Sequence, residues 1–126
     1  MARILVIDDV PSFTALLKVV LEGRGHSVTE RHDGESGLAE AQQGGYELVM
    51  IDMMMPGLDG IECVRRLRTL GPPLTIIAMS GGTDRFPAAY SLKLSEMHGA
   101  DRLLFKPFDN AELVATVEEV LAERAT

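Results

Sequence analysis

Acidic, hydroxyl and amino side chains stand directly at the ends of short apolar segments in this sequence. Asp8 and Asp9 follow the segment RILVI, and Asp52 follows ELVMI. Ser80 follows LTIIAM, and Lys106 follows RLLF. If these segments are parallel strands, the polar residues meet at one edge of the sheet, which is where open α/β sheets bind ligands.

These residue types suit metal-assisted phosphoryl chemistry. Three crowded carboxylates repel one another, and a divalent cation removes that repulsion. Oxygen ligands without histidine or cysteine favour Mg²⁺ or Mn²⁺ over zinc. A carboxylate beside such a cation is a competent nucleophile for phosphorus, and a lysine with a hydroxyl group can neutralise the oxygens of the transferred group. Asp52 is the candidate nucleophile.

The elements that must position these residues follow from the hydrophobic pattern. Short apolar runs alternate with longer amphipathic stretches, as expected of βα units around a parallel sheet. We therefore predict a (βα)₅ domain of the α/β class, with a doubly wound, parallel five-stranded sheet. The predicted strands are Arg3–Ile7, His26–Arg31, Glu47–Asp52, Leu74–Met79 and Arg102–Phe105. The predicted helices begin near Pro11, at Asp33-Gly34, after a cap at Asp59, at Pro87 and at Asp109.

Composition and charge narrow the class of protein. The net charge of −7 argues against nonspecific binding to nucleic acid, which needs a basic surface. No apolar run is long enough to span a bilayer, so no membrane association is expected. A lone cysteine, Cys63, suits a reducing cytoplasm and a structural role on its helix. We expect residues 1–126 to form a single domain without an attached output domain.

Four motifs in order make the sequence similar to the receiver domain of two-component signalling, and the resemblance covers essentially the whole chain. The motifs are ILVIDD at 4–9, IDMMMPGLDG at 51–60, AMSGG at 78–82 and GADRLLFKPF at 99–108. The resemblance implies a flavodoxin-like sheet with strand order 2-1-3-4-5, as in a chemotaxis receiver. It also implies a cis peptide bond between Lys106 and Pro107.

The resemblance further implies a role for each site residue. Asp52 would be the phosphoacceptor. Asp9, Asp52 and the backbone carbonyl of Met54 would ligate Mg²⁺ (or Mn²⁺) directly, with Asp8 acting through water. Ser80 would turn toward the phosphoryl group, and Lys106 would pair with it.

The sequence departs from the family pattern at the position three residues before the lysine. The family usually has Tyr or Phe there as a gate coupled to the switch hydroxyl, whereas this chain has Leu103. The segment between Ser80 and Gly99 also looks about four residues longer than usual. We predict that the loop before Pro87, with Phe86 and Tyr90, reports the switch instead.

The implied partners are proteins. A histidine kinase or phosphotransfer protein would donate the phosphoryl group, and an unidentified downstream protein would read the result. The reading surface would be the face formed by the helix after Pro87, strand Arg102–Phe105 and the last helix, and the chain would be a monomer or a weak homodimer through that face. Such a chain is a cytoplasmic signalling receiver rather than an enzyme, since it catalyses only its own phosphorylation and dephosphorylation.

Two alternatives from other classes remain open at this point. A haloacid-dehalogenase-type phosphatase also uses a strand-end aspartate, magnesium and a lysine, but it needs a second acid where this chain has Met54. A flavodoxin-like binding module would need a hydroxyl-rich phosphate loop after the first strand, where this chain has Asp-Asp-Val-Pro. The three histidines, His26, His32 and His98, are predicted to be surface residues.

Overall fold

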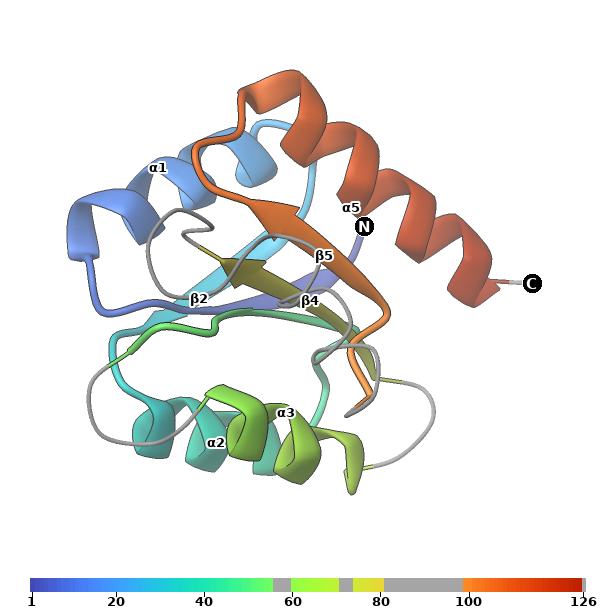
Figure 1. Ribbon diagram of the computed structural model, residues 1–126. Coiled ribbons are helices and arrows are strands. Elements are labelled where there is room, and N and C mark those ends of the chain that lie inside the picture. Colours follow the sequence, from blue (N-terminus) through green and yellow to red (C-terminus); the bar gives the residue numbers. More distant parts are fainter. Residues whose placement is uncertain (56–59, 71–73, 81–98, 126) are drawn as a thin grey trace.

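The computed structural model describes residues 1–55, 60–70, 74–80 and 99–125. Its strands form one parallel sheet in the order β2-β1-β3-β4-β5 (Figure 1). The strands are β1 (Arg3–Ile7), β2 (Ser27–Arg31), β3 (Leu48–Asp52), β4 (Thr75–Ser80) and β5 (Arg102–Phe105). The described helices are α1 (Pro11–Glu22), α2 (Gly34–Gln42), α3 (Gly60–Arg68) and α5 (Asn110–Ala125). The predicted (βα)₅ class and the 2-1-3-4-5 strand order are confirmed.

Helices cover both faces of the sheet, α1 and α5 on one side and α2 and α3 on the other (Figure 1). Alternate strand residues therefore enter two separate cores. Ile4 and Val6 pack toward α1 and α5, whereas Leu5 and Ile7 pack toward α2 and α3. Because β1, β3 and β4 are buried on both faces, they are almost wholly apolar until their carboxyl ends.

Helix boundaries follow local chemistry. The side chain of Asp33 accepts a hydrogen bond from the Ser36 N–H and caps α2, and Asp109 does the same for the Glu112 N–H at the start of α5. Pro11 occupies the first turn of α1, where its missing N–H costs nothing.

Small differences from the predicted bounds have physical causes. Helix α3 ends at Arg68, because Thr69 and Leu70 donate to the carbonyls three residues back and close a tight turn. Strand β2 begins at Ser27 because the His26 N–H donates to Leu21 at the end of α1. Strands β3 and β4 each start one residue later than predicted, and β4 extends through Ser80.

Several predicted features lie outside the described residues. These are the cap at Asp59, the helix starting at Pro87, the loop with Phe86 and Tyr90, and His98.

The prediction that His26 lies on the surface is wrong. Its side chain is only 7% exposed. Its Nδ1 accepts a hydrogen bond from the Ala2 N–H, and its Nε2 lies 3.1 Å from a carboxylate oxygen of Glu118 on α5. Histidine is buried here because both ring nitrogens find partners. Cys63 is fully buried, as expected for a structural role.

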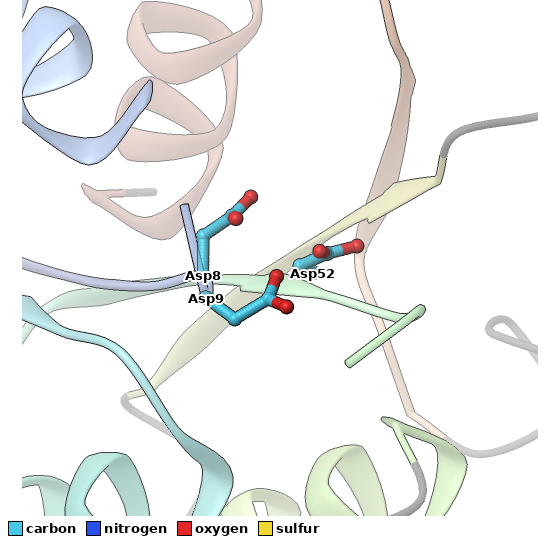
Figure 2. A group of neighbouring side chains, drawn as sticks. All are labelled: Asp8, Asp9 and Asp52. Carbon is cyan, nitrogen blue, oxygen red and sulfur yellow. The ribbon is translucent and has the colours of Figure 1, made fainter. Parts of the chain in front are cut away.

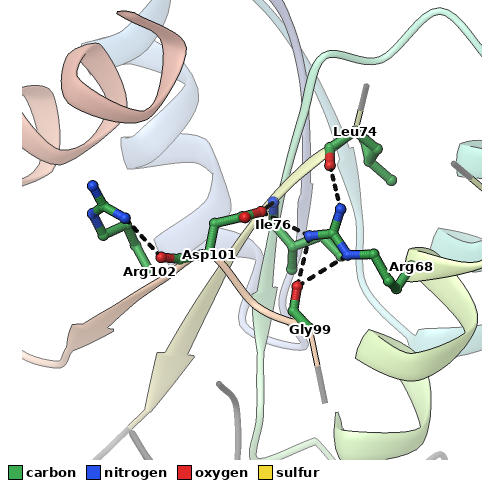
Figure 3. Close-up of polar contacts among 6 residues, drawn as sticks. All are labelled: Arg68, Leu74, Ile76, Gly99, Asp101 and Arg102. Atoms are coloured by element: carbon green, nitrogen blue, oxygen red, sulfur yellow. Dashed lines mark hydrogen bonds and ion pairs between the residues drawn. The ribbon is translucent and has the colours of Figure 1, made fainter. Parts of the chain in front are cut away.

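Arg68 joins three segments at the amino ends of β4 and β5 (Figure 3). Its guanidinium donates to the carbonyl oxygens of Leu74 and Gly99, at 2.8 and 2.6 Å, and to Asp101 at 2.7 Å. The same Asp101 oxygen accepts the Ile76 N–H at 2.8 Å. The fork of an arginine suits several acceptors at once in a way that a lysine ammonium does not.

We predict that Arg68→Ala lowers the free energy of unfolding by about 2–3 kcal/mol, because it leaves these acceptors without their charged donor. Arg68→Lys should restore less than half of the loss. Arg66→Ala is the matched control on the same helix: Arg66 pairs with Glu62 at the exposed surface, and its substitution should cost less than about 0.5 kcal/mol. Urea unfolding measures all three variants, and equal losses for Arg66→Ala and Arg68→Ala would contradict the prediction.

Candidate functional site

Three carboxylates meet at the carboxyl edge of the sheet (Figure 2). The register pairs Ile7 of β1 with Ile51 of β3, so the next residues, Asp8 and Asp52, lie side by side. One oxygen from each of Asp8, Asp9 and Asp52 lies within 4.8 Å of the others. Asp8 is fully buried, Asp52 is 5% exposed and Asp9 is exposed. The cluster predicted from the strand ends is therefore present.

The buried Asp8 has a hydrogen-bond donor at each carboxylate oxygen. Its Oδ1 accepts the Val10 N–H at 3.0 Å, which turns the chain into α1. Its Oδ2 accepts from the Nζ of Lys106 at 2.6 Å. A buried carboxylate needs such donors, and they leave Asp8 less available than Asp9 to a further ligand.

Asp52 is held by its own chain. Its Oδ1 accepts the Met54 N–H at 3.0 Å, and its Oδ2 lies 3.6 Å from the Lys106 Nζ. Burial raises the pKa of Asp52 above its ordinary value of 3.8, the Met54 N–H and Lys106 offset part of that rise, and the charges of Asp8 and Asp9 add to it. The ionised form of Asp52 is therefore destabilised in the folded protein.

Lys106 brings a positive charge to the cluster. It follows β5, its N–H donates to the Ser80 carbonyl at 2.8 Å, and its peptide bond to Pro107 is cis, as expected. Its ammonium also lies over the ring of Phe13 on α1, 4.3 Å from the ring centroid. No motif in the sequence marked Phe13, because the contact joins α1 to the segment after β5 and depends on how the two pack.

Gly60 sets how closely α3 approaches the chain after Asp52. A Cβ atom on Gly60 would lie 2.6 Å from the carbonyl oxygen of Met53 and 2.7 Å from its Cα. Such contacts do not occur without displacement of the backbone. Glycine at this position therefore lets the start of α3 pack directly against the backbone of Met53, the residue after Asp52.

Ser80 and Leu103 lie on the two strands beyond Asp52. Asp52 pairs with Met79 in the register, so Ser80 is one residue farther along β4, and it is 2% exposed. Leu103 pairs with Ala78 and packs, partly buried, against the core on the α2–α3 side. The other predicted switch residues, Phe86 and Tyr90, lie outside the described residues, as does Gly82.

The donor set fits a hard divalent cation. Every ligand candidate in the cluster is a carboxylate oxygen, which is the ligand type of Mg²⁺ and Mn²⁺. Among the residues that the structure describes, three carboxylates face one ammonium, and these four groups carry a net charge of two negative units when all are ionised. A divalent cation balances that charge.

Comparisons with known proteins agree with this geometry. The model of the response regulator receiver domain matches residues 4–118. The uncharacterized transcriptional regulatory protein YkoG of Bacillus subtilis is 35% identical over 124 residues, which are 98% of this chain and 53% of YkoG. The transcriptional regulatory protein TcrA of Mycobacterium tuberculosis is 40% identical over 116 residues, which are 90% of this chain and 43% of TcrA. The chain belongs to the response-regulator receiver family.

Solved receiver structures superpose closely. A CheY-like receiver domain protein from Methanospirillum hungatei has a TM-score of 0.90 at 26% identity, covering 99% of this chain and 97% of that one. TrrA from Thermotoga maritima, solved in complex with Mg²⁺-BeF, has a TM-score of 0.81 at 33% identity, covering 94% of this chain and 98% of its own. The receiver domain described here thus has the phosphorylatable aspartate pocket of two-component response regulators, and neither alternative class is favoured.

The match is to part of each curated relative. The receiver chain spans about half the length of YkoG and TcrA. Among the residues that the structure describes, none of the helices has both the length and the apolar composition of a membrane span.

We predict that Asp52→Asn raises the free energy of unfolding of the metal-free receiver by about 1 kcal/mol at neutral pH. Folding raises the pKa of Asp52, so its ionised form opposes folding above that pKa, and asparagine removes the charge while keeping an acceptor for the Met54 N–H. The advantage of asparagine should shrink as the pH falls through the raised folded pKa toward 3.8, and it should vanish below 3.8, where Asp52 is protonated in both states.

Urea unfolding in a chelating buffer between pH 4 and 8 measures this difference. Added Mg²⁺ should stabilise the original receiver more than the variant, because a cation that binds only the folded state adds to its stability. A less stable Asp52→Asn variant at neutral pH would contradict the proposed repulsion.

Proposed function

We propose that Asp52 of this receiver accepts a phosphoryl group from a phosphohistidine donor in a magnesium-dependent reaction. The observation that carries the proposal is the cluster of Asp8, Asp9 and Asp52 with Lys106 at the edge of the sheet. Receiver domains bind Mg²⁺ and interact with histidine kinases, and the related TrrA structure carries Mg²⁺-BeF.

The residues around Asp52 would have different roles in binding the cation. Asp9, Asp52 and the Met54 carbonyl would hold Mg²⁺ directly, and Asp8, whose oxygens already accept from Val10 and Lys106, would act through water. The bound cation would supply positive charge to the oxygens of the phosphoryl group.

In the transfer itself, an oxygen of Asp52 attacks phosphorus while the bond from phosphorus to the donor nitrogen breaks. We propose Oδ2 as the attacking oxygen, because the Met54 N–H holds Oδ1 and Lys106 lies on the side of Oδ2. The bonding electrons leave with the donor imidazole. Lys106 then neutralises part of the charge on the new aspartyl phosphate.

The signal would pass through Ser80 to a protein-binding surface. In this proposal Ser80 turns toward the phosphoryl group. This movement shifts the balance between two conformations of the face that includes β5 and α5. Leu103 occupies the position where receivers usually have a Tyr or Phe gate. In this proposal it therefore couples to Ser80 in a different way from that aromatic residue. The downstream partner is a protein, or a second copy of the chain through the same face, and the setting is cytoplasmic.

Intact-mass analysis with Mg²⁺ and acetyl phosphate tests the chemistry. We expect one phosphoryl group on the receiver and none on Asp52→Ala, because both oxygens of Asp8 already accept hydrogen bonds, from Val10 and Lys106, whereas Oδ2 of Asp52 lies 3.6 Å from the Lys106 Nζ. Asp33→Asn is the matched control: Asp33 is exposed and caps α2, and asparagine caps equally well. Phosphorylation of Asp52→Ala, or none of the original chain, would contradict the proposal.

A second prediction concerns how long the phosphoryl group lasts. Met54 and Gly82, two residues after Asp52 and Ser80, cannot orient an attacking water by a side-chain hydrogen bond, and the Met54 side chain is 42% exposed. We expect a lifetime of minutes or longer without a phosphatase, and a several-fold shorter one for Met54→Asn. Decay followed by mass spectrometry measures both, and a lifetime of seconds for the original chain is the contrary result.

A further inference from the structure

The ammonium of Lys106 lies against an aromatic ring as well as two carboxylates. Its Nζ lies 2.6 Å from Asp8 Oδ2, 3.6 Å from Asp52 Oδ2 and 4.3 Å from the centroid of the Phe13 ring. A cation at this distance from a ring face is attracted by the negative charge of the π system. The side chain of Lys106 is 22% exposed, so water screens the contact only in part.

The ring of Phe13 is itself held in place. Phe108, two residues after Lys106, meets it edge to face, with centroids 5.8 Å apart and planes at 71°. Both rings pack against the core on the α1–α5 side of the sheet. The packing of Phe13 therefore holds its ring in place beneath Lys106.

The ring restricts where the ammonium can go. It covers one side of Nζ and offers no oxygen there, so the N–H bonds have their acceptors on the side of Asp8 and Asp52. The ammonium lies closer to Asp8 than to Asp52. A small shift toward Asp52 would exchange one acceptor for the other without leaving the ring.

We infer that Phe13 is a positioning residue for phosphoryl transfer: its ring holds the ammonium of Lys106 between Asp8 and Asp52. The inference rests on the proposed function of Asp52, but the contact itself can be tested without it. Phe13 touches neither the phosphoryl donor nor the reacting atoms, and it acts only through Lys106.

Nuclear magnetic resonance tests the contact directly. The chain has three lysines, Lys18, Lys93 and Lys106, so lysine-selective labelling gives a simple spectrum, and Lys106→Met assigns the signal. We expect the Lys106 Hε protons to be shifted upfield by the ring. The shift should disappear in Phe13→Leu and persist in Phe13→Tyr and Phe108→Leu. An unshifted Lys106 in the original chain would overturn the inference.

The rate of Asp52 phosphorylation by acetyl phosphate tests the consequence. Phe13→Leu should slow it about three- to tenfold, the scale of a partly desolvated cation–π contact, and Phe13→Tyr should restore it. Phe108→Leu is the matched control, since it removes the partner ring from the same core but leaves the ring under Lys106. Equal slowing by Phe13→Leu and Phe108→Leu would reduce Phe13 to a packing residue and overturn the inference.

A fluorinated phenylalanine at position 13 keeps the size of the ring and weakens the negative charge of its face, so it remains informative if Phe13→Leu does not fold. It should slow phosphorylation, and an unchanged rate would count against the inference. If the original chain is not phosphorylated at all, the proposed function fails, whereas the resonance of Lys106 still decides whether the contact exists.

Discussion

The repulsion among Asp8, Asp9 and Asp52 is the constraint around which the functional edge of this domain is arranged. Two of these carboxylates are almost wholly buried, and the parallel register of β1 and β3 leaves them no way to separate. Hydrogen-bond donors and a cation at the site partly offset that negative charge. Backbone N–H groups of Val10 and Met54 point at the oxygens, and Lys106 reaches across from β5. The charge that remains is what suits the edge to a cation and to phosphoryl chemistry.

The two-sided burial of the sheet explains why the polar residues gather at one edge. Strand β1 enters one core with Ile4 and Val6 and the other with Leu5 and Ile7. A charged residue inside such a strand would be buried without partners, at a cost that few domains tolerate. Polar chemistry is therefore confined to the strand ends, where the chain turns and backbone donors become available.

The same confinement explains how much of the molecule was predictable from its sequence. Continuous apolar runs followed by Asp, Ser or Lys predicted four of the five strands and the polar residues that meet at their carboxyl ends, and β5 was predicted with its observed bounds. The contact of Lys106 with Phe13 left no comparable pattern, because it depends on how α1 packs beside the segment after β5. The burial of His26 was missed for a similar reason, since its partners Ala2 and Glu118 lie in different parts of the chain.

The network around Arg68 has a mechanical consequence. It fastens β4, the start of β5 and the end of α3 at the edge of the sheet opposite the carboxylates. The parallel ladder continues along both strands to Ser80 and Phe105, and the Lys106 N–H donates to the Ser80 carbonyl beyond it, so β4 and β5 are joined at both ends. The backbones of Ser80 and Lys106 are thereby held together at the functional edge, which leaves a change of position there to their side chains.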